Sequence, residues 1–187
     1  MRILSVARES LPRLTPDLGA VTVGDRTYLV GGYDGNSIRA TTIATTDGAA
    51  FSLLGDLPVP VRYPAVAAEG TNVVIFGGMT GAGATKAVQV LDTQTGAVRV
   101  VGQLPQTLSD ASATTVRGQI YVFGGLWGGT ATAQVWRWDS ATTTLVPVGT
   151  MSAPVTDGAA ATIGDSAYYV GGESPLPTAT VSILTVR

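Results

Sequence analysis

Ile120-Tyr121-Val122-Phe123-Gly124-Gly125 is a short apolar run that ends on two glycines, and it recurs along the chain. Its relatives are Tyr28-Leu29-Val30-Gly31-Gly32, Val73-Val74-Ile75-Phe76-Gly77-Gly78 and Tyr168-Tyr169-Val170-Gly171-Gly172. The first glycines of the four pairs, at positions 31, 77, 124 and 171, are separated by 46, 47 and 47 residues. A fixed period of this length indicates a propeller or another array of structural repeats.

Each run predicts a β-strand, because it is too short for a helix, rich in β-branched and aromatic residues, and ended by a glycine pair. The runs are apolar at every position instead of alternating with polar residues. We therefore expect both faces of each strand to be covered by other protein. In a propeller this is the situation of a strand whose blade has a neighbouring blade on either side.

A second marker has the same period. It is a Leu-Pro junction at Leu11-Pro12, Leu57-Pro58 and Leu104-Pro105, with the weaker Met151-Ser152 in the fourth place. Two markers in phase make a chance repeat improbable.

With these markers the chain resembles the kelch-repeat β-propellers, whose repeat has an apolar strand ending in Gly-Gly, a later turn containing Asp and a Leu-Pro junction. The resemblance covers essentially the whole chain. The Tyr and Trp that the family usually carries after the glycines are largely absent here: Trp138 lies beside Asp139, whereas Leu91 and Thr46 hold the equivalent places. The resemblance implies an all-β, kelch-like propeller of antiparallel four-stranded blades that acts as a non-catalytic binding or assembly scaffold.

We expect one domain over residues 1–187. Its repeats are expected at 11–56, 57–103, 104–150 and 151–187, with 1–10 added to the last. By this count the fourth repeat has three strands, and residues 2–7 form an extra strand at the N-terminus. Pairing of that strand with residues 180–186 would complete the fourth blade and remove an open sheet edge.

The ring itself has alternative forms. A compact four-bladed monomer, half of an eight-bladed homodimer and a fragment of a longer propeller would share these features. Four blades alone need a steep wedge between neighbours and therefore bulky outer residues. Aromatic residues make up only 6% of the chain, which favours more blades and hence the homodimer.

Composition excludes several functions. The 187 residues are 45% hydrophobic and 13% charged, with a net charge of −2 and scattered basic residues, so neither disorder nor nucleic-acid binding is expected. The chain has no Cys and no His, which excludes the usual zinc, copper and iron sites, and we expect no cofactor. No apolar run reaches the length of a membrane span, and the N-terminus is unlike a signal peptide. We expect a soluble chain without membrane insertion, and its localisation stays open.

Catalysis is not expected either. No His is present as a general base, no Cys as a nucleophile, and Lys86 is the only lysine. Kelch-like oxidases use histidines at a copper site, so that activity is not implied here. The glycine-rich residues 81–86 fit neither a Rossmann nor a P-loop spacing, and we expect a surface connection there.

Three carboxylates occur in phase, each six residues after the start of a junction: Asp17, Asp110 and Asp157, with Tyr63 in the same place of the second repeat. One interpretation is a partial acidic ring at a mouth of the channel, as a ligand or cation site or, with Arg62, a hydrolase. The other, which we favour, is that each Asp caps its loop by accepting backbone N–H bonds. Asp47, Asp92 and Asp139 are expected to be turn residues.

Strand parity predicts which face binds a partner. In an up-and-down blade the loops after the second and fourth strands emerge on one side, and these loops carry the larger side chains. The predicted binding residues on that side are Tyr33, Asp34, Arg62, Tyr63, Trp127 and Glu173. For Trp127, folding back over its own blade is the alternative. The partner, a protein or a small ligand, is not identified by the sequence.

Overall fold

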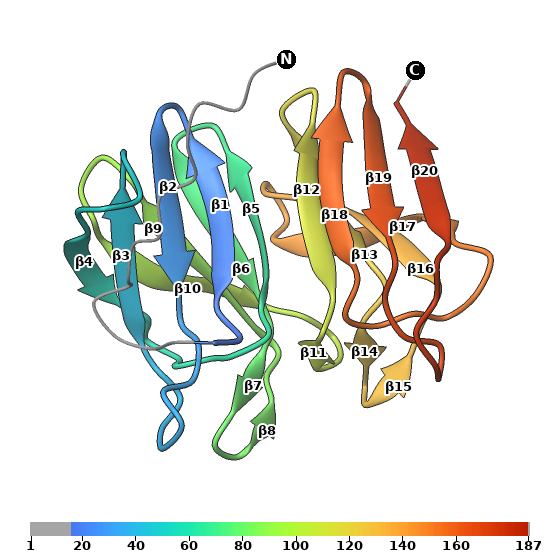
Figure 1. Cartoon of the computed structure of the whole chain (residues 1–187), viewed down its shortest axis with the longest axis horizontal. Coiled ribbons are helices and arrows are strands. Elements are labelled where there is room, and N and C mark those ends of the chain that lie inside the picture. Colours follow the sequence, from blue (N-terminus) through green and yellow to red (C-terminus); the bar gives the residue numbers. More distant parts are fainter. Residues whose placement is uncertain (1–15, 187) are drawn as a thin grey trace.

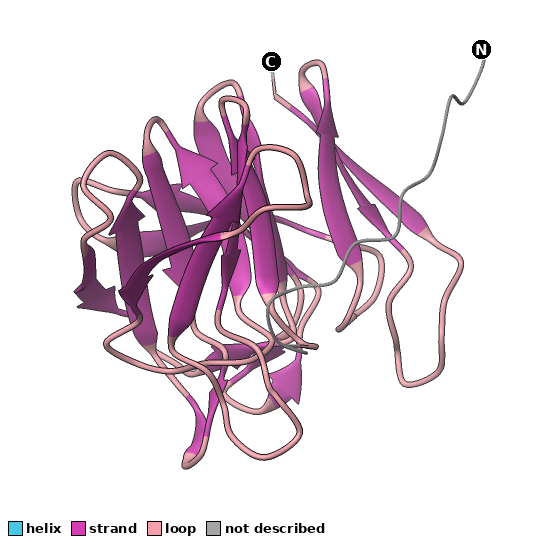
Figure 2. Cartoon of the chain, turned by 60° about the vertical axis from the view of Figure 1, so that its left-hand side comes forward, coloured by secondary structure: helices cyan, strands magenta, loops and turns pink. Residues whose placement is uncertain are grey.

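The computed structural model describes residues 16–186, which form strands and loops throughout, as expected for an all-β chain (Figures 1 and 2). The strand expected at residues 2–7 and the first Leu-Pro junction lie outside these residues. Along 16–186 no helix offers a span long and apolar enough to cross a membrane.

Four antiparallel sheets, numbered 1 to 4 here, follow one another along the chain. Sheet 1 contains β1 (Gly19–Val23), β2 (Arg26–Val30), β3 (Thr41–Thr45) and β4 (Ser52–Asp56). Sheet 2 contains β5 (Ala65–Glu69), β6 (Asn72–Phe76), β9 (Ala87–Asp92) and β10 (Val98–Gln103). Sheet 3 contains β12 (Ser112–Val116), β13 (Gln119–Phe123), β16 (Gln134–Asp139) and β17 (Thr144–Thr150). Sheet 4 contains β18 (Ala159–Ile163), β19 (Ser166–Val170) and β20 (Val181–Thr185).

Short strands occupy the loops after the second strands of sheets 2 and 3 and the connection between these two sheets. They are β7 (Met79–Thr80) with β8 (Gly83–Ala84), and β11 (Leu108–Ser109) with β14 (Leu126–Trp127) and β15 (Thr130–Ala131). The glycine-rich residues 81–86, expected to be a plain surface connection, thus include one strand of a small hairpin. The turn prediction for Asp47, Asp92 and Asp139 is confirmed, because each carboxylate accepts two backbone N–H groups of its own turn.

The first strand of each sheet lies innermost, and β1, β5, β12 and β18 pack side by side in that order (Figure 1). Between β18 and β1 the described residues show no comparable packing. The row of sheets is therefore open between sheet 4 and sheet 1. We call the side that a sheet turns toward the next sheet its forward face, and the opposite side its rear face.

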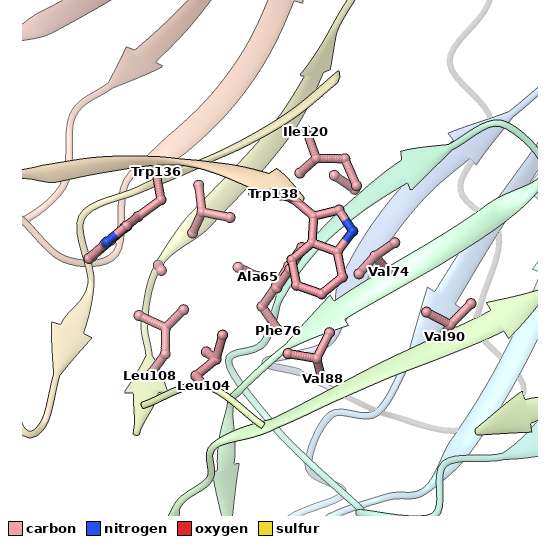
Figure 3. Close-up of a cluster of buried hydrophobic side chains, with 13 residues drawn as sticks. Ala65, Val74, Phe76, Val88, Val90, Leu104, Leu108, Ile120, Trp136 and Trp138 are labelled. Carbon is pink, nitrogen blue, oxygen red and sulfur yellow. The ribbon is translucent and has the colours of Figure 1, made fainter. Parts of the chain in front are cut away.

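The core consists of three clusters, each between two successive sheets. Between sheets 2 and 3, the ring of Phe76 meets Trp138 edge-on with centroids 5.1 Å apart (Figure 3). Between sheets 3 and 4, Phe123 lies 6.0 Å from Tyr169. Since every cluster needs two sheets, no sheet buries its apolar residues by itself.

The expectation that every apolar run is covered on both faces holds for β6 and β13, whose last four residues are buried. It is wrong for β19. There Ala167 and Tyr169 on the rear face are buried, whereas Val170 on the forward face is 48% exposed. The reason is that sheet 3 covers the rear face, while no described sheet lies on the forward face.

The glycine pairs mark the point where one repeat touches the next. The first glycines, at φ of +68° for Gly31, +59° for Gly77 and +58° for Gly124, lie in the left-handed region that favours glycine. A Cβ atom on any of them would collide with a backbone carbonyl oxygen of the following repeat, which belongs to Val61, Leu108 and Val155 in turn. The second glycines, Gly32, Gly78 and Gly125, each donate their N–H to that same oxygen at 2.8 Å.

Replacing Gly77 by Ala is expected to lower the free energy of unfolding by about 3 to 4 kcal/mol, the sum of left-handed strain and the collision with Leu108 O. Gly70→Ala is the matched control, because Gly70 has the same φ of +59° but nothing within 4 Å of the added carbon. It should cost about 1 kcal/mol. Urea unfolding would measure both, and equal losses would contradict the role given to close approach.

Candidate functional site

The connections with the largest side chains gather at one end of the sheets. Figure 1 shows the β7–β8 hairpin and strands β11, β14 and β15 below the four sheets, at a common end. The tight turns between the first two strands of each sheet lie at the opposite end (Figure 1). This is the separation that strand parity predicts, and we call the first end the loop face.

Four in-phase residues of the loop face are joined by their backbones. Asp17, Tyr63, Asp110 and Asp157 have φ of +64°, +54°, +57° and +57°. The N–H of Tyr63 donates to Asp17 O at 2.8 Å, that of Asp110 to Tyr63 O at 3.2 Å, and that of Asp157 to Asp110 O at 3.0 Å. We call this series the backbone belt. It links each repeat to the one before it across the ends of the inner strands.

The belt explains the periodic recurrence of Asp17, Asp110 and Asp157 by backbone conformation and not by the loop capping that we expected. Asp tolerates positive φ better than most residues, so backbone conformation accounts for its recurrence. The predicted capping is not seen, since in residues 16–186 no backbone N–H donates to the side chains of Asp17, Asp110 or Asp157. Asp110 instead accepts a hydrogen bond from the Ser109 hydroxyl at 2.5 Å.

The alternative of a metal site is not supported by side-chain placement. Within residues 16–186 no group of three or more His, Cys, Asp or Glu side chains is arranged to hold a metal ion. The aspartates still interact. Burial raises the pKa of the Asp110 carboxyl, and the charges of Asp157 and Asp17 raise it further, against the Ser109 hydrogen bond and the charge of Arg62.

Arg62 is the centre of a charged and aromatic cluster. Its guanidinium carbon lies 5.1 Å from the ring centroids of both Tyr33 and Tyr63. Its Nη1 lies 3.8 Å from Asp17 Oδ2. The hydrogen bond to the Asp17 carboxylate raises the pKa of the Tyr63 hydroxyl. We call these four residues the Arg62 cluster. They come from the segment before β1, the loop after β2 and the junction before β5.

One donor of this cluster is unused. The Arg62 Nε atom is buried and has no hydrogen-bond partner among the described residues. Because this atom is buried, a ligand would have to reach the other guanidinium nitrogens of Arg62, whose side chain is 33% exposed. The Asp17 contact at 3.8 Å is also long for a charge-assisted hydrogen bond. The guanidinium therefore retains capacity to bind a carboxylate or a carbonyl.

A groove of about 730 Å³ adjoins the cluster on the loop face. It runs between the loop after β2, the junction at 58–60 and the β7–β8 hairpin. Its lining includes Tyr33, Ile38, Pro58, Val59, Pro60 and Thr80. Tyr33 thus belongs to both the groove and the Arg62 cluster.

One wall of the groove is fixed from below by Gln89, which is fully buried. Its Oε1 accepts from the Val59 N–H and its Nε2 donates to the Val59 carbonyl, both at 2.9 Å. Gln89, Val59 and Ile38 are not among the binding residues predicted from the sequence. The one signal for Gln89 was a polar residue within the otherwise apolar run 87–91.

The other predicted binding residues make separate contacts. The Asp34 carboxylate accepts N–H bonds from Asn36 and Ser37 and pairs with Arg39 at 3.0 Å, so it holds its own loop. Trp127 is half-buried against Trp136, with centroids 4.9 Å apart. Glu173 is exposed and its backbone pairs with Thr156. The structure brings Tyr33, Tyr63, Arg62 and Asp17 together, whereas Asp34, Trp127 and Glu173 are not part of that cluster.

Comparison with known proteins identifies one family. The model of the KLHDC2/KLHL20/DRC7 Kelch-repeats domain matches residues 18–185. This range contains all four sheets and, apart from Asp17, the residues of the loop face described above. No curated protein matches the chain.

Trp127→Ala is expected to lower the free energy of unfolding by about 2 kcal/mol, because it removes the stack on Trp136 and part of the apolar cover of the core between sheets 2 and 3. Trp127→Phe should retain most of that stability. Thermal unfolding of both variants would test this, and unchanged stability of the Ala variant would mean that the ring contributes little to the fold.

Asp110→Asn is expected to stabilise the protein at neutral pH, since the raised pKa means that the ionised carboxylate disfavours the folded state. Asn keeps an acceptor for the Ser109 hydroxyl and tolerates the positive φ. As the pH falls through the raised folded pKa toward the ordinary 3.8, the wild type gains a proton and the difference should shrink. Asp165→Asn is the control, because its lowered pKa predicts no such gain. Urea unfolding across this pH range would measure the difference, and an Asp110→Asn chain less stable than the wild type at pH 7 would contradict the argument.

Proposed function

Because the chain belongs to the kelch-repeat family, we propose that it is a protein-interaction scaffold that binds an extended polypeptide segment on its loop face. Kelch-repeat domains are in general binding scaffolds without enzymatic activity. The observation that carries the proposal is the apolar groove beside the Arg62 cluster, with Tyr33 common to both.

The chemistry of this site fits a peptide. Tyr and Arg are enriched among the residues that dominate binding energy at interfaces. Arg62 already lies against two tyrosine rings, so less side-chain entropy is lost when it binds. Apolar side chains of the segment would occupy the groove over Val59 and Ile38. A carboxylate or carbonyl of the segment would accept from the guanidinium of Arg62, whose contact with Asp17 is long at 3.8 Å and whose side chain is 33% exposed.

The remaining predicted residues extend this face. Asp34 shapes the loop that presents Tyr33, while Trp127, Glu173, Asp110 and Asp157 lie on the connections of later sheets. We propose that they contact a longer partner beyond the groove. Binding by Trp127 would then add to its packing role against Trp136.

We also propose the architecture that presents the face. Sheets 1 to 4 are taken as blades of a propeller, with repeats at 11–56, 57–103, 104–150 and 151–187 plus 1–10 in one domain. Residues 2–7 would add a fourth strand beside β20, in the same chain or, in a homodimer, in the other copy. The support is that sheets 1 to 3 have four strands each and sheet 4 has three, with β20 at its edge.

The test is peptide selection from a random library on the immobilised wild-type chain, followed by fluorescence anisotropy with the selected peptides. Arg62→Ala and Val59→Asp should each weaken binding by about tenfold or more. Arg117→Ala is the matched control, because Arg117 pairs with Asp165 at 2.6 Å at the opposite end of the sheets. Equal weakening by Arg117→Ala, or no effect of Arg62→Ala, would refute the assignment of the site.

A further inference from the structure

The forward face of sheet 4 is an apolar surface that no described residue covers. Ile163, Val170, Val181 and Ile183 are 70%, 48%, 54% and 61% exposed. The strand register places Val170 opposite Val181 and Tyr168 opposite Ile183, so these side chains share one face. A contiguous apolar face of this kind indicates an interaction surface.

The same positions in the other sheets are buried by the following sheet. In sheet 3 the equivalents of Val170 and Val181 are Phe123 and Val135, which are 1% and 5% exposed and pack against Tyr169 of sheet 4. In sheet 2 they are Phe76 and Val88, packed with Trp138 of sheet 3. The forward face of sheet 4 therefore has apolar residues at the positions that, in sheets 2 and 3, are covered by the following sheet.

The backbone belt indicates which kind of sheet could cover the forward face of sheet 4. Each of its three bonds runs from the N–H of one repeat to the carbonyl of the repeat before. At the two ends of the series, the N–H of Asp17 and the carbonyl of Asp157 take part in no bond of the belt. Within residues 16–186 neither group has a backbone partner. A repeat that follows sheet 4 would have to supply an N–H like that of Asp17.

A second series of bonds along the inner strands ends in the same way. The Thr115 hydroxyl donates to Ala68 O at 2.5 Å, and the Thr162 hydroxyl to Thr115 O at 2.9 Å. The next donor should reach the Thr162 carbonyl. Thr22 is the residue of β1 in phase with Ala68, Thr115 and Thr162, and it carries a hydroxyl.

Sheet 1 also has an apolar rear face to match. Its register aligns Ala20, Leu29, Ile43 and Leu53 in one row across β1 to β4. Leu53 is 70% exposed. Sheet 1, with the segment before it, therefore carries the three features that a sheet following sheet 4 would need. These are the Asp17 N–H, the Thr22 hydroxyl and an apolar row.

We infer that the forward face of sheet 4 binds the rear face of sheet 1 of a second copy of this chain, and that two copies close one ring. In the described residues no strand of sheet 4 packs closely on a strand of sheet 1, and in this arrangement a second copy would supply each junction. A two-fold axis makes both junctions identical and satisfies both open ends. The belt then continues from Asp157 of one copy to Asp17 of the other, so the series of belt residues is closed only when two copies meet. This identifies the surface of the proposed homodimer and is independent of the peptide site.

Gly171 provides the sharpest probe. Its φ is +69°, like that of the other first glycines, but the nearest atom to an added Cβ is Thr178 O of its own loop, at 3.7 Å. At Gly31, Gly77 and Gly124 the carbonyl of the following repeat occupies that space. An alanine at this position would fit a single copy, apart from left-handed strain, and would obstruct the second.

The experiment is light scattering coupled to gel filtration on the full chain over a concentration series. The wild type is expected at about twice 19.0 kDa. Gly171→Ala and Ile183→Arg should each shift the mass to that of one copy. Their controls should leave it unchanged: Gly164→Ala, at φ of +57° with nothing within 4 Å, and Val148→Arg, at a valine 44% exposed on β17. Circular dichroism would verify that each variant is folded.

A wild-type mass of 19.0 kDa at every concentration would overturn the inference, including the case in which residues 2–7 close the molecule on itself. So would a dimer that survives both Gly171→Ala and Ile183→Arg, or a series of larger masses from an open array. The peptide site is tested separately, because neither variant touches Tyr33, Val59 or Arg62. A monomeric Ile183→Arg chain that still binds the selected peptides would support the interface and leave the proposed function intact.

Discussion

The structure depends on one close approach, in which a backbone carbonyl of each repeat lies against the glycine pair of the repeat before. The oxygens of Val61, Leu108 and Val155 occupy the space where a side chain of the first glycine would be, and they accept the N–H of the second. This contact fixes the distance between successive sheets. The carbonyl leaves no room for a side chain on the first glycine, and φ of +98°, +99° and +86° at Gly32, Gly78 and Gly125 favours glycine at the second position. The three core clusters lie between sheets that are joined in this way.

The backbone belt extends the same principle to the loop face. Positive φ at one position per repeat turns the chain so that its N–H reaches the preceding repeat, and Asp occupies three of the four positions. Tyr63 is the exception, although this conformation costs a tyrosine more than an aspartate. It is also the residue whose ring lies against Arg62, beside the groove. The repeat that departs from the pattern is the one that carries the candidate site.

Because apolar residues are buried between sheets, the first and last sheets depend on what lies beyond them. This follows from the one-dimensional construction of repeat proteins, in which each unit contacts only its neighbours. Val135 of sheet 3 is 5% exposed, whereas its equivalent in sheet 4, Val181, is 54% exposed. Val181 is exposed because no described sheet covers it and because β20 is the edge strand of its sheet, whereas β16, which carries Val135, has β17 beside it. The loop face and the exposed forward face of sheet 4 are thus two different surfaces of one stacked arrangement of sheets.

The sequence by itself determined the all-β fold, the period of the repeats, the turns at Asp47, Asp92 and Asp139, and the end at which the large loops gather. These depend on local conformation and on strand parity, which spacing and residue type encode directly. It did not determine why Asp17, Asp110 and Asp157 recur, because a carboxylate that caps a loop and a backbone at positive φ select the same residue. Nor did it indicate that Gln89 holds Val59, or that Tyr33, Tyr63 and Asp17 meet around Arg62 while Trp127 packs on Trp136. The contacts of Tyr33 and Asp17 with Arg62 join two repeats, so they need the stacking of sheets 1 and 2. The contacts of Gln89 with Val59 and of Trp127 with Trp136 join separate segments of one repeat, which only the folding of that repeat brings within reach of each other.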